Sequence, residues 1–473
     1  MRKAGIVLLL SLAQITNAQT SNTDYSDAFR LLDQWIAAGR DYGHLPGISV
    51  AVVKDQETIW SKAYGYSNLA NKVPATTNTL YSICSISKLF TAIAIMQLYE
   101  EGKLRLDDPV TSVLTDFSLK QQFKDSGPIT IRSLLTHSSG LPRESDYPYW
   151  TGPDFPFPTE SQVNSKLSSQ QTLYPASTYF QYSNLGLTLL GEIVEKVSGK
   201  KYKEYVEEKI LKPLQLNATH PYLPKEEYGK KLAIGYSALS REGNREPVAL
   251  FDARGITAAA GYSSNVTDLA RFASWQFRLL EKGGTEVLKT STLKEMQRVH
   301  WIDPDWTTSW GLGFSVSKQG TTTLVGHGGS CPGYRSTLQM DPKEKLAYTV
   351  MINAGGESPE FYAREIREVI SKIPKEKQAL KPEVDLNKFA GLYSSQPWSS
   401  EFLVTPWYGD LAILELPSAN PDESMTLLRH VEGNKFRRVR SDKTLGEEHI
   451  FETDSNGNVV RVIRHSNYSM KIK

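Results

Sequence analysis

The sequence lacks the features that define several large classes of protein. Beyond residue 20 it has no run of 18 uninterrupted apolar residues, so we expect no transmembrane segment. It has no excess of one charge, with 54 Lys and Arg residues against 52 Asp and Glu, which excludes the electrostatic footprint of a protein that binds nucleic acid or an anionic membrane. Its eight histidines form no His-x-x-x-His or His/Cys cluster, so neither a catalytic metal nor another cofactor is indicated.

The remaining composition is that of an ordinary globular protein. The 473 residues are 40% hydrophobic and 22% charged, which excludes collagen-like, disordered and polytopic membrane chains. A chain of this length has room for two or three domains.

The first 18 residues have the three parts of a secretory signal peptide. Arg2 and Lys3 form the charged end, Gly5 to Leu12 the apolar stretch, and Thr16-Asn17-Ala18 a small-residue cleavage site. The alternative, a buried N-terminal helix, fits less well because the apolar run is short and ends in polar residues. We therefore expect cleavage after residue 18 and a secreted or periplasmic protein.

The apolar pattern predicts strands at both ends of a first domain, over residues 19–378, with helices between them. Residues 48–53 and 58–64 read as a hairpin, and helices are predicted over 89–98, 185–197 and 265–280, the last beginning at Asn265 or Thr267. Further strands are predicted over 311–316, 322–325, 336–340 and 346–352. This order favours an α+β core in which the first and last strands share one antiparallel sheet.

Two other segments stand apart from this core. Four prolines between Arg143 and Thr159 predict a stiff loop, whose aromatic residues either pack beneath it or line a pocket mouth. A charged linker over Ile373–Gln378 leads to strand-like sequence with a hairpin turn at Asp454–Gly457. Residues 383–473 are therefore predicted to form a small antiparallel β domain.

Chemistry is first indicated by the tetrad Ser85-Ile86-Ser87-Lys88. Positions i and i+3 share one face of a helix, so Lys88 can reach the Ser85 hydroxyl. A serine is a poor nucleophile until a base takes its proton, and a desolvated lysine can do so. Three other Ser-x-x-Lys tetrads, at 198–201, 291–294 and 315–318, are interpreted as solvated helix ends or strand surface, because only Ser85 opens an apolar helix.

Two further motifs follow along the chain. Tyr182-Ser183-Asn184 precedes a predicted helix, and His327-Gly328-Gly329 ends a predicted strand. Each also has a purely structural interpretation, as a helix start, a core histidine or a β-bulge. The ordered combination of Ser-x-x-Lys, Tyr-x-Asn and His-x-Gly is much more specific than any one of them.

With their flanking phrases, these motifs resemble the serine β-lactamase and penicillin-binding superfamily, and within it the class C-related serine hydrolases. The phrases, between Gly47 and about Ile352, are PGISVAVV, YSICSISKLFTA, ITIRSLLTHSSGLP, FQYSNLGLTLLGEIVE, AAAGYSSNVTDLARF, WGLGF and GHGGSCPGYRSTLQMDP. The resemblance implies an antiparallel sheet flanked by helices, a helical lobe opposite, and an active site between them. The C-terminal segment resembles the lipocalin-like barrels appended to some of these hydrolases.

The resemblance also implies a role for each motif residue. Ser85 would be the nucleophile and Lys88 its proton-transfer partner. Tyr182 would act as base or acid, its pKa lowered by Lys88. The substrate-binding residues would be Asn184, His327, Gly328, Gly329 and Ser330, with the backbone N–H groups of Ser85 and Ser330 forming the oxyanion hole.

The same oxyanion hole would bring Cys84 and Cys331 together, since each cysteine adjoins one of its two donors. Certain class A carbapenem-hydrolysing enzymes have a similar pattern, with a disulfide behind the nucleophile. The resemblance therefore implies a possible disulfide, and two buried free thiols are the open alternative.

His-x-Gly departs from the Lys-Thr-Gly usual in β-lactamases and resembles DD-peptidases, D-aminopeptidases and esterases. We expect an exported serine hydrolase that cleaves an amide or ester bond in a small molecule or short peptide, with D-residue peptides as first expectation and small esters as second. The alternatives are β-lactamase or penicillin-binding activity, and a non-catalytic peptidoglycan- or ligand-binding protein. The sequence indicates no oligomeric state.

Overall fold

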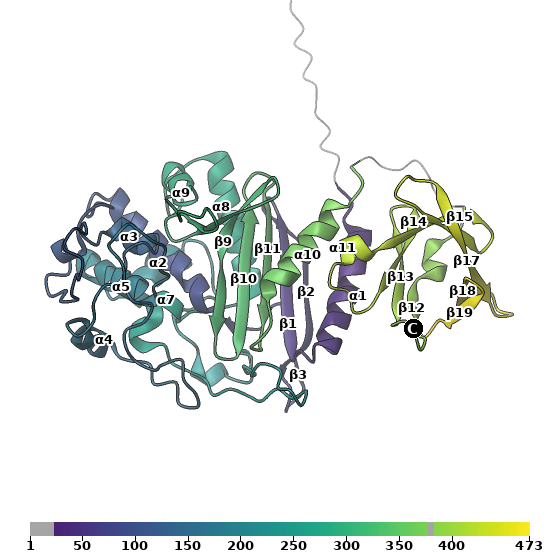
Figure 1. Ribbon diagram of the computed structural model, residues 1–473, viewed down its shortest axis with the longest axis horizontal. Helices are drawn as coiled ribbons and strands as arrows, with labels where there is room; N and C mark the ends of the chain where they lie inside the picture. Colours follow the sequence, from purple (N-terminus) through teal and green to yellow (C-terminus); the bar gives the residue numbers. More distant parts are fainter. Residues whose placement is uncertain (1–22, 376–382) are drawn as a thin grey trace, which may run out of the picture.

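The computed structural model describes residues 23–375 and 383–473. The predicted signal peptide, residues 1–18, and residues 376–378 of the predicted linker lie outside the described residues. The chain forms a helical lobe, a central sheet covered by helices, and a C-terminal β barrel, arranged in a row (Figure 1). Within the described ranges, no helix is both long and apolar enough to cross a membrane.

The central sheet has nine antiparallel strands, and its middle is formed by the two ends of the first domain. In spatial order the strands are β3 (Val73–Pro74), β2 (Glu57–Asn68), β1 (Gly47–Lys54), β11 (Leu346–Ile352), β10 (Tyr334–Asp341), β9 (Thr322–Cys331), β8 (Ser315–Gln319), β7 (Ser309–Trp310) and β6 (Trp301–Ile302). Ile48 of β1 lies opposite Ile352 of β11. The prediction that the first and last strands share one sheet is confirmed.

One predicted strand, over residues 311–316, is wrong in its first four residues and overlaps β8 at its last two. The backbone N–H of Leu312 donates to Met296, and that of Gly313 donates to Leu135, so neither is free for a sheet ladder. Gly313 also has a φ of 79°, which an extended strand does not adopt. The strand therefore begins at Ser315.

Helices cover both faces of the sheet. Helix α8 (Val266–Lys282) lies on one face, and α1 (Ser26–Tyr42) and α10 (Pro359–Ser371) lie on the other (Figure 1). The Asn265 side chain accepts the backbone N–H of Asp268 at 2.8 Å, which identifies Asn265 rather than Thr267 as the N-cap of α8.

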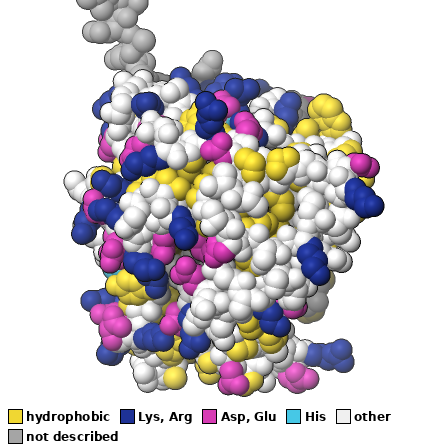
Figure 2. All heavy atoms as spheres, turned by 90° about the vertical axis from the view of Figure 1, so that its left-hand side faces the viewer, with side chains coloured by type: hydrophobic (Ala, Val, Ile, Leu, Met, Phe, Trp, Pro, Cys, Tyr) yellow, Lys and Arg dark blue, Asp and Glu magenta, His cyan; other side chains and the backbone are white. Residues whose placement is uncertain are grey.

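The lobe is built around α2 (Ser87–Glu100), whose side chains are buried on nearly every side. The lobe also contains α3 (Ile131–Leu135), α4 (Glu160–Leu167), α5 (Asn184–Ser198), α6 (Tyr202–Val206) and α7 (Thr257–Ala260), whereas α9 (Thr290–Met296) packs against α8. Helix α5 ends at Gly199, which has a left-handed φ of 72° as its predicted C-cap role requires. Seen end-on, the lobe has basic and acidic side chains interspersed over its surface (Figure 2).

The C-terminal barrel has eight antiparallel strands in sequence order. They are β12 (Gly391–Tyr393), β13 (Phe402–Trp407), β14 (Asp410–Glu415), β15 (Thr426–Glu432), β16 (Lys435–Val439), β17 (Leu445–Thr453), β18 (Val459–Arg464) and β19 (Asn467–Met470), with a short helix, α11 (Pro421–Ser424), before β15. Backbone bonds from Leu392 to Lys473 and from Ser394 to Met470 bring the two sheet edges together. The barrel encloses its own apolar core.

The outside of the barrel packs against α1. Leu403, Trp407 and Leu414 share an apolar cluster with Trp35 of that helix, and the Trp35 indole donates to the Ser418 carbonyl at 2.8 Å. Helix α10 also covers the sheet and contacts α11, and the Lys372 Nζ lies 3.4 Å from the Asp422 carboxylate, so α1 and α10 both carry the contact between barrel and sheet.

Candidate active site

The sequence places Ser85 in a tight turn at the start of α2. A 3₁₀ turn over Cys84–Ile86 leads into the helix, and Cys84 has a left-handed φ of 52°. Ser85 is partly exposed, whereas Lys88, one turn further on, is only 1% exposed. The Lys88 Nζ lies 3.0 Å from the Ser85 Oγ, so the tetrad forms the pair that its spacing predicts.

The surroundings of Lys88 favour a neutral amine. Burial lowers the pKa of Lys88 well below its usual range, with Arg143 acting in the same direction and Glu144 in the opposite one. Two of the three partners of Nζ, the Asn184 Oδ1 and the Ala259 carbonyl, both at 2.8 Å, can only accept hydrogen bonds. A neutral amine has two N–H groups for these oxygens, which leaves its lone pair directed to the Ser85 hydroxyl.

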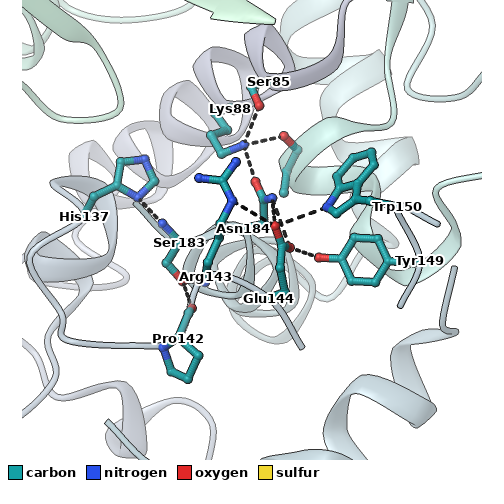
Figure 3. A network of polar contacts seen from close by, with 12 residues as sticks. Ser85, Lys88, His137, Pro142, Arg143, Glu144, Tyr149, Trp150, Ser183 and Asn184 are labelled. Carbon is teal, nitrogen blue, oxygen red and sulfur yellow. Dashed lines mark hydrogen bonds and ion pairs between the residues drawn. The ribbon is translucent and has the colours of Figure 1, made fainter. Parts of the chain in front are cut away.

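Glu144 fixes the orientation of Asn184 and was not predicted from the sequence. The Asn184 Nδ2 donates to both carboxylate oxygens, at 2.8 and 3.1 Å, so the amide oxygen is the atom that faces Lys88 (Figure 3). The carboxylate also accepts from the Tyr149 hydroxyl and from the Trp150 indole. A carboxylate with this many donors holds the amide in one of its two possible orientations.

The proline-rich loop supplies these donors. Tyr149 is fully buried, and Trp150 and Phe157 pack with it in the lobe core beside Phe251. The interpretation that the loop aromatics pack beneath it is therefore confirmed, and two of them also reach the site through Glu144. No short motif signals this role, because it depends on how the loop folds back.

Tyr182 lies beside the Ser85–Lys88 pair, but its acidity differs from the expectation. The Lys88 Nζ is 4.9 Å from the centre of the Tyr182 ring. Burial raises the pKa of Tyr182 far above its usual value, and the hydrogen bond to Ser85 opposes this only in part. The expectation that Lys88 lowers this pKa is wrong, because burial disfavours the charged phenolate and is the largest effect on Tyr182. Tyr182 therefore holds its proton at neutral pH.

His137 is a second neighbour that sequence reasoning did not single out. Its ring centre lies 4.3 Å from that of Tyr182, and its Nδ1 accepts the backbone N–H of Ser183 at 3.1 Å. Burial lowers the pKa of His137 well below its usual value, so the imidazole is neutral. It therefore packs as a neutral ring that positions Tyr182. The sequence feature that could have identified His137 is the phrase THSSGLP, which contains it.

The third motif lies on β9 directly against the nucleophile turn. A Cβ on Gly329 would lie closer than 3.0 Å to the Ser336 Oγ and to the Ile83 carbonyl oxygen, so only glycine fits there. The Ser336 hydroxyl donates to that same Ile83 carbonyl at 3.0 Å. Ser336 lies on β10 opposite Gly329, so β9 and β10 together are held next to the residue that precedes Cys84.

His327 and Ser330 flank the two glycines of this strand. His327 is 6% exposed, and burial lowers its pKa to about 3, so it is neutral. Its Nδ1 lies 2.6 Å from the Gly328 carbonyl, whereas its buried Nε2 has no hydrogen-bond partner in the part of the chain that the structure describes. Ser330 follows as an exposed residue of β9.

A disulfide ties the two segments together. The structure joins Cys84 and Cys331, whose Cα atoms are 5.7 Å apart although 247 residues separate them in sequence. One cysteine precedes Ser85 and the other follows Ser330. The predicted site residues from α2, the start of α5 and β9 thus lie around one point between lobe and sheet.

Comparisons with known proteins agree with this geometry. A family model described as Beta-lactamase matches residues 32–370. The chain is 27% identical over 341 residues to Protein flp of Staphylococcus aureus (strain NCTC 8325 / PS 47), with 70% of this chain and 64% of that protein covered. It is 30% identical over 337 residues to the unguisins hydrolase ungD' of Aspergillus campestris, with 68% and 59% covered. The chain thus spans less than two thirds of the length of these curated relatives.

Two solved structures are similar to this chain, the first over nearly all of it and the second over about three quarters. The octameric penicillin-binding protein homologue from Pyrococcus abyssi has a TM-score of 0.64 and 28% identity, with 94% of this chain and all of that chain covered. A D-stereospecific amidohydrolase from Streptomyces sp. has a TM-score of 0.58 and 25% identity, with 72% and 98% covered.

Proposed function

The chain belongs to the Beta-lactamase family, and from this premise we propose that it is a serine hydrolase that cleaves amide or ester bonds through an acyl-enzyme on Ser85. The observation that carries the proposal is the arrangement around the Lys88 amine. The Nζ lies within hydrogen-bond distance of the Ser85 Oγ and of two acceptor oxygens, and in its neutral form the amine donates to those two oxygens and keeps its lone pair for the Ser85 hydroxyl. That arrangement is what an activated serine nucleophile requires.

In the proposed reaction, Lys88 accepts the hydroxyl proton as the Ser85 Oγ attacks the substrate carbonyl carbon. The backbone N–H groups of Ser85 and Ser330 donate to the oxyanion of the tetrahedral intermediate. Tyr182, which holds its proton, gives it to the leaving nitrogen or oxygen and recovers a proton from Lys88. Water then hydrolyses the acyl-enzyme by the same transfers in reverse.

For the substrate we propose short peptides with D-residues, with small esters as the second candidate. The name of the Streptomyces neighbour, a D-stereospecific amidohydrolase, supports the first. Efficient β-lactam hydrolysis is disfavoured because the neutral His327 stands where β-lactamases have a lysine that holds the carboxylate of the antibiotic. The signal-like segment of residues 1–18 supports export, so we propose a secreted or periplasmic site of action.

The test compares the wild type with Ser85→Ala on D- and L-amino-acid p-nitroanilides, p-nitrophenyl esters and a fluorescent penicillin. We expect the wild type to turn over a D-anilide or an ester and to carry a trapped acyl group on Ser85 by mass spectrometry. Ser85→Ala should lose all turnover with an unchanged melting temperature, because it removes one partly exposed hydroxyl. Turnover by pure Ser85→Ala would overturn the mechanism, and binding without any acylation would favour a non-catalytic ligand-binding protein.

A further inference from the structure

The C-terminal barrel contains a polar cavity that the proposed hydrolase mechanism does not use. Most of the barrel interior is filled by an apolar core that includes Phe389, Phe402, Phe436 and Phe451. At the end where β14, β16 and β18 finish, the core gives way to a cavity of about 250 Å³. Barrel mouths of this kind are a common place for small-molecule sites.

The side chains that line the cavity point into the barrel. In the strand register, His449 of β17 lies opposite Phe436 on one side and Arg464 on the other, so all three share the inner face. Glu447 is two residues before His449 and shares that face as well. The cavity thus lies at the rim of the barrel interior, where the Arg438 and Glu415 side chains are about half exposed.

Two buried polar atoms in this cavity lack partners. His449 is 5% exposed, and its Nδ1 has no hydrogen-bond partner among the described residues. The Oε2 of Glu447 likewise has no hydrogen-bond partner among the described residues, although this side chain is 40% exposed and the oxygen lies 3.9 Å from a nitrogen of Arg438. Folded proteins rarely leave such atoms unpaired, because a buried polar group without a hydrogen bond has lost its hydration and gained no compensating interaction. Both atoms line the same cavity, which points to a bound ligand as the missing partner.

The charges around the cavity are balanced and loosely paired. A nitrogen of Arg464 lies 3.7 Å from the Glu415 carboxylate, and a nitrogen of Arg438 lies 3.9 Å from that of Glu447. Both separations exceed hydrogen-bond distance, so the guanidinium donors are not consumed by these carboxylates. Burial lowers the pKa of His449 to about 4, so its ring adds no charge at neutral pH.

From these observations we infer that the barrel mouth binds a small zwitterion, namely a free α-amino acid or a dipeptide. Arg464 and Arg438 would hold the carboxylate, since guanidinium groups match it with paired N–H donors. Glu415 and Glu447 would hold the ammonium group. A simple anion fits less well because the two glutamates repel it, and a simple cation is repelled by the arginines. The cavity volume limits the ligand to a small one.

The inference is tested by calorimetry on full-length Ser85→Ala, in which the proposed active site cannot consume the ligand. The probes are D- and L-alanine, alanyl-alanine, and two alanine derivatives with one charge removed, N-acetyl-alanine and alaninamide. We expect one saturable site for alanine or alanyl-alanine, and at least about tenfold weaker binding of both derivatives. Equal binding of a derivative, tighter binding of acetate or inorganic phosphate, or no binding of any probe at about 10 mM would overturn the inference.

Variants locate the site within the chain. Arg464→Gln should weaken binding about tenfold or more, whereas Arg461→Gln, on the same strand but the opposite face and paired with Glu452, should not change it. If Arg464→Gln does not fold by circular dichroism, Arg438→Gln serves in its place. Binding that survives both arginine changes would place the ligand elsewhere, including in the active site, and would overturn the inference without affecting the proposed hydrolase activity.

Discussion

At the scale of single residues, the site depends on which atom of Asn184 faces Lys88. An amide can turn its oxygen or its nitrogen toward a neighbour, and only the oxygen gives Lys88 an acceptor. Glu144 keeps the amide oxygen turned toward Lys88, because both of its carboxylate oxygens accept hydrogen bonds from the Asn184 Nδ2. Glu144 touches neither Ser85 nor Lys88 by hydrogen bond, so we regard it as a positioning residue.

Glu144→Gln should therefore change the pH dependence of the reaction. The carboxylate of Glu144 raises the pKa of Lys88, so removing its charge lowers that pKa further. The reaction needs neutral Lys88, so kcat/KM rises with pH as Lys88 loses its proton, and this rise is the acid limb of the pH profile. We expect the acid limb of kcat/KM to move to lower pH, together with about a tenfold loss of turnover.

The measurement is a pH profile of kcat/KM for the wild type, Glu144→Gln and Glu242→Gln. Glu242 is an exposed acid that is not among the groups acting on Lys88, so its variant should behave as the wild type. An acid limb that stays in place or moves to higher pH in Glu144→Gln would contradict the role of this carboxylate.

Tyr182→Phe tests the assignment of the proton donor. The change removes only the hydroxyl and preserves the ring packing against His137. Because Tyr182 keeps its proton at neutral pH, we expect loss of general-acid help and a fall in kcat of about 10²-fold. Substrates with a good leaving group, such as p-nitrophenolate, should lose less than anilides. An unchanged kcat on anilides would mean that Lys88 alone transfers the proton.

At the scale of elements, the site depends on how closely β9 approaches the turn before α2. The approach is set at Gly329, where a side chain would collide with the Ile83 carbonyl and the Ser336 hydroxyl. The neighbouring Gly328 faces a different group, because a Cβ there would lie 2.5 Å from the Oε1 of Glu360. A backbone carbonyl cannot move aside, whereas the end of a glutamate side chain can.

The two glycines therefore provide a matched pair of variants. Gly329→Ala should push β9 away from the nucleophile turn and lower kcat/KM by about 10²-fold or more, since misplacement of about 1 Å costs this much. Gly328→Ala should cost less than about tenfold. The measurement is kcat/KM for both variants, with melting temperatures to show that each is folded. Equal losses would mean that the distance between β9 and the turn does not control catalysis.

At the scale of the whole molecule, three apolar cores lie in a row. One joins the lobe to the sheet, one joins the other face of the sheet to α1, α10 and the barrel, and one fills the barrel. The site lies at the first of these, and the cavity of the barrel mouth lies at one end of the third, with Ser424 of α11 in its lining. The Cys84–Cys331 disulfide is the covalent link across the first junction.

Replacing both cysteines by alanine should lower the stability of the first domain. The bond closes a loop of 247 residues, for which loop entropy predicts about 5–6 kcal/mol. We expect a fall of roughly 5–15 °C in melting temperature and reduced turnover, because β9 is no longer tied to the nucleophile turn. Thiol titration of the denatured, unreduced wild type should find no free thiol. Two thiols per chain would contradict the bond.

Local sequence pattern determined much of this protein. The hairpin of β1 and β2, the helices α2 and α5 and the strand β11 follow from apolar periodicity and from caps such as Gly199, which act over a few residues. The pairing of Ser85 with Lys88 was equally predictable, because it needs only one helical turn. The strand expected over 311–316 failed where Gly313 bends away to bonds with residues distant in the sequence.

Only the tertiary structure decided the electrostatics of the site. The pKa shifts of Lys88 and Tyr182 come mainly from burial. Lys88 contacts Asn184 of α5 and Ala259 of α7, and Tyr182 packs against His137 and Trp310, which no pattern near either residue encodes. Glu144 becomes a positioning residue only because Tyr149 and Trp150 fold back onto it. The sequence by itself thus determined which groups carry the chemistry, and the fold decided their protonation, because desolvation depends on neighbours that are remote along the chain.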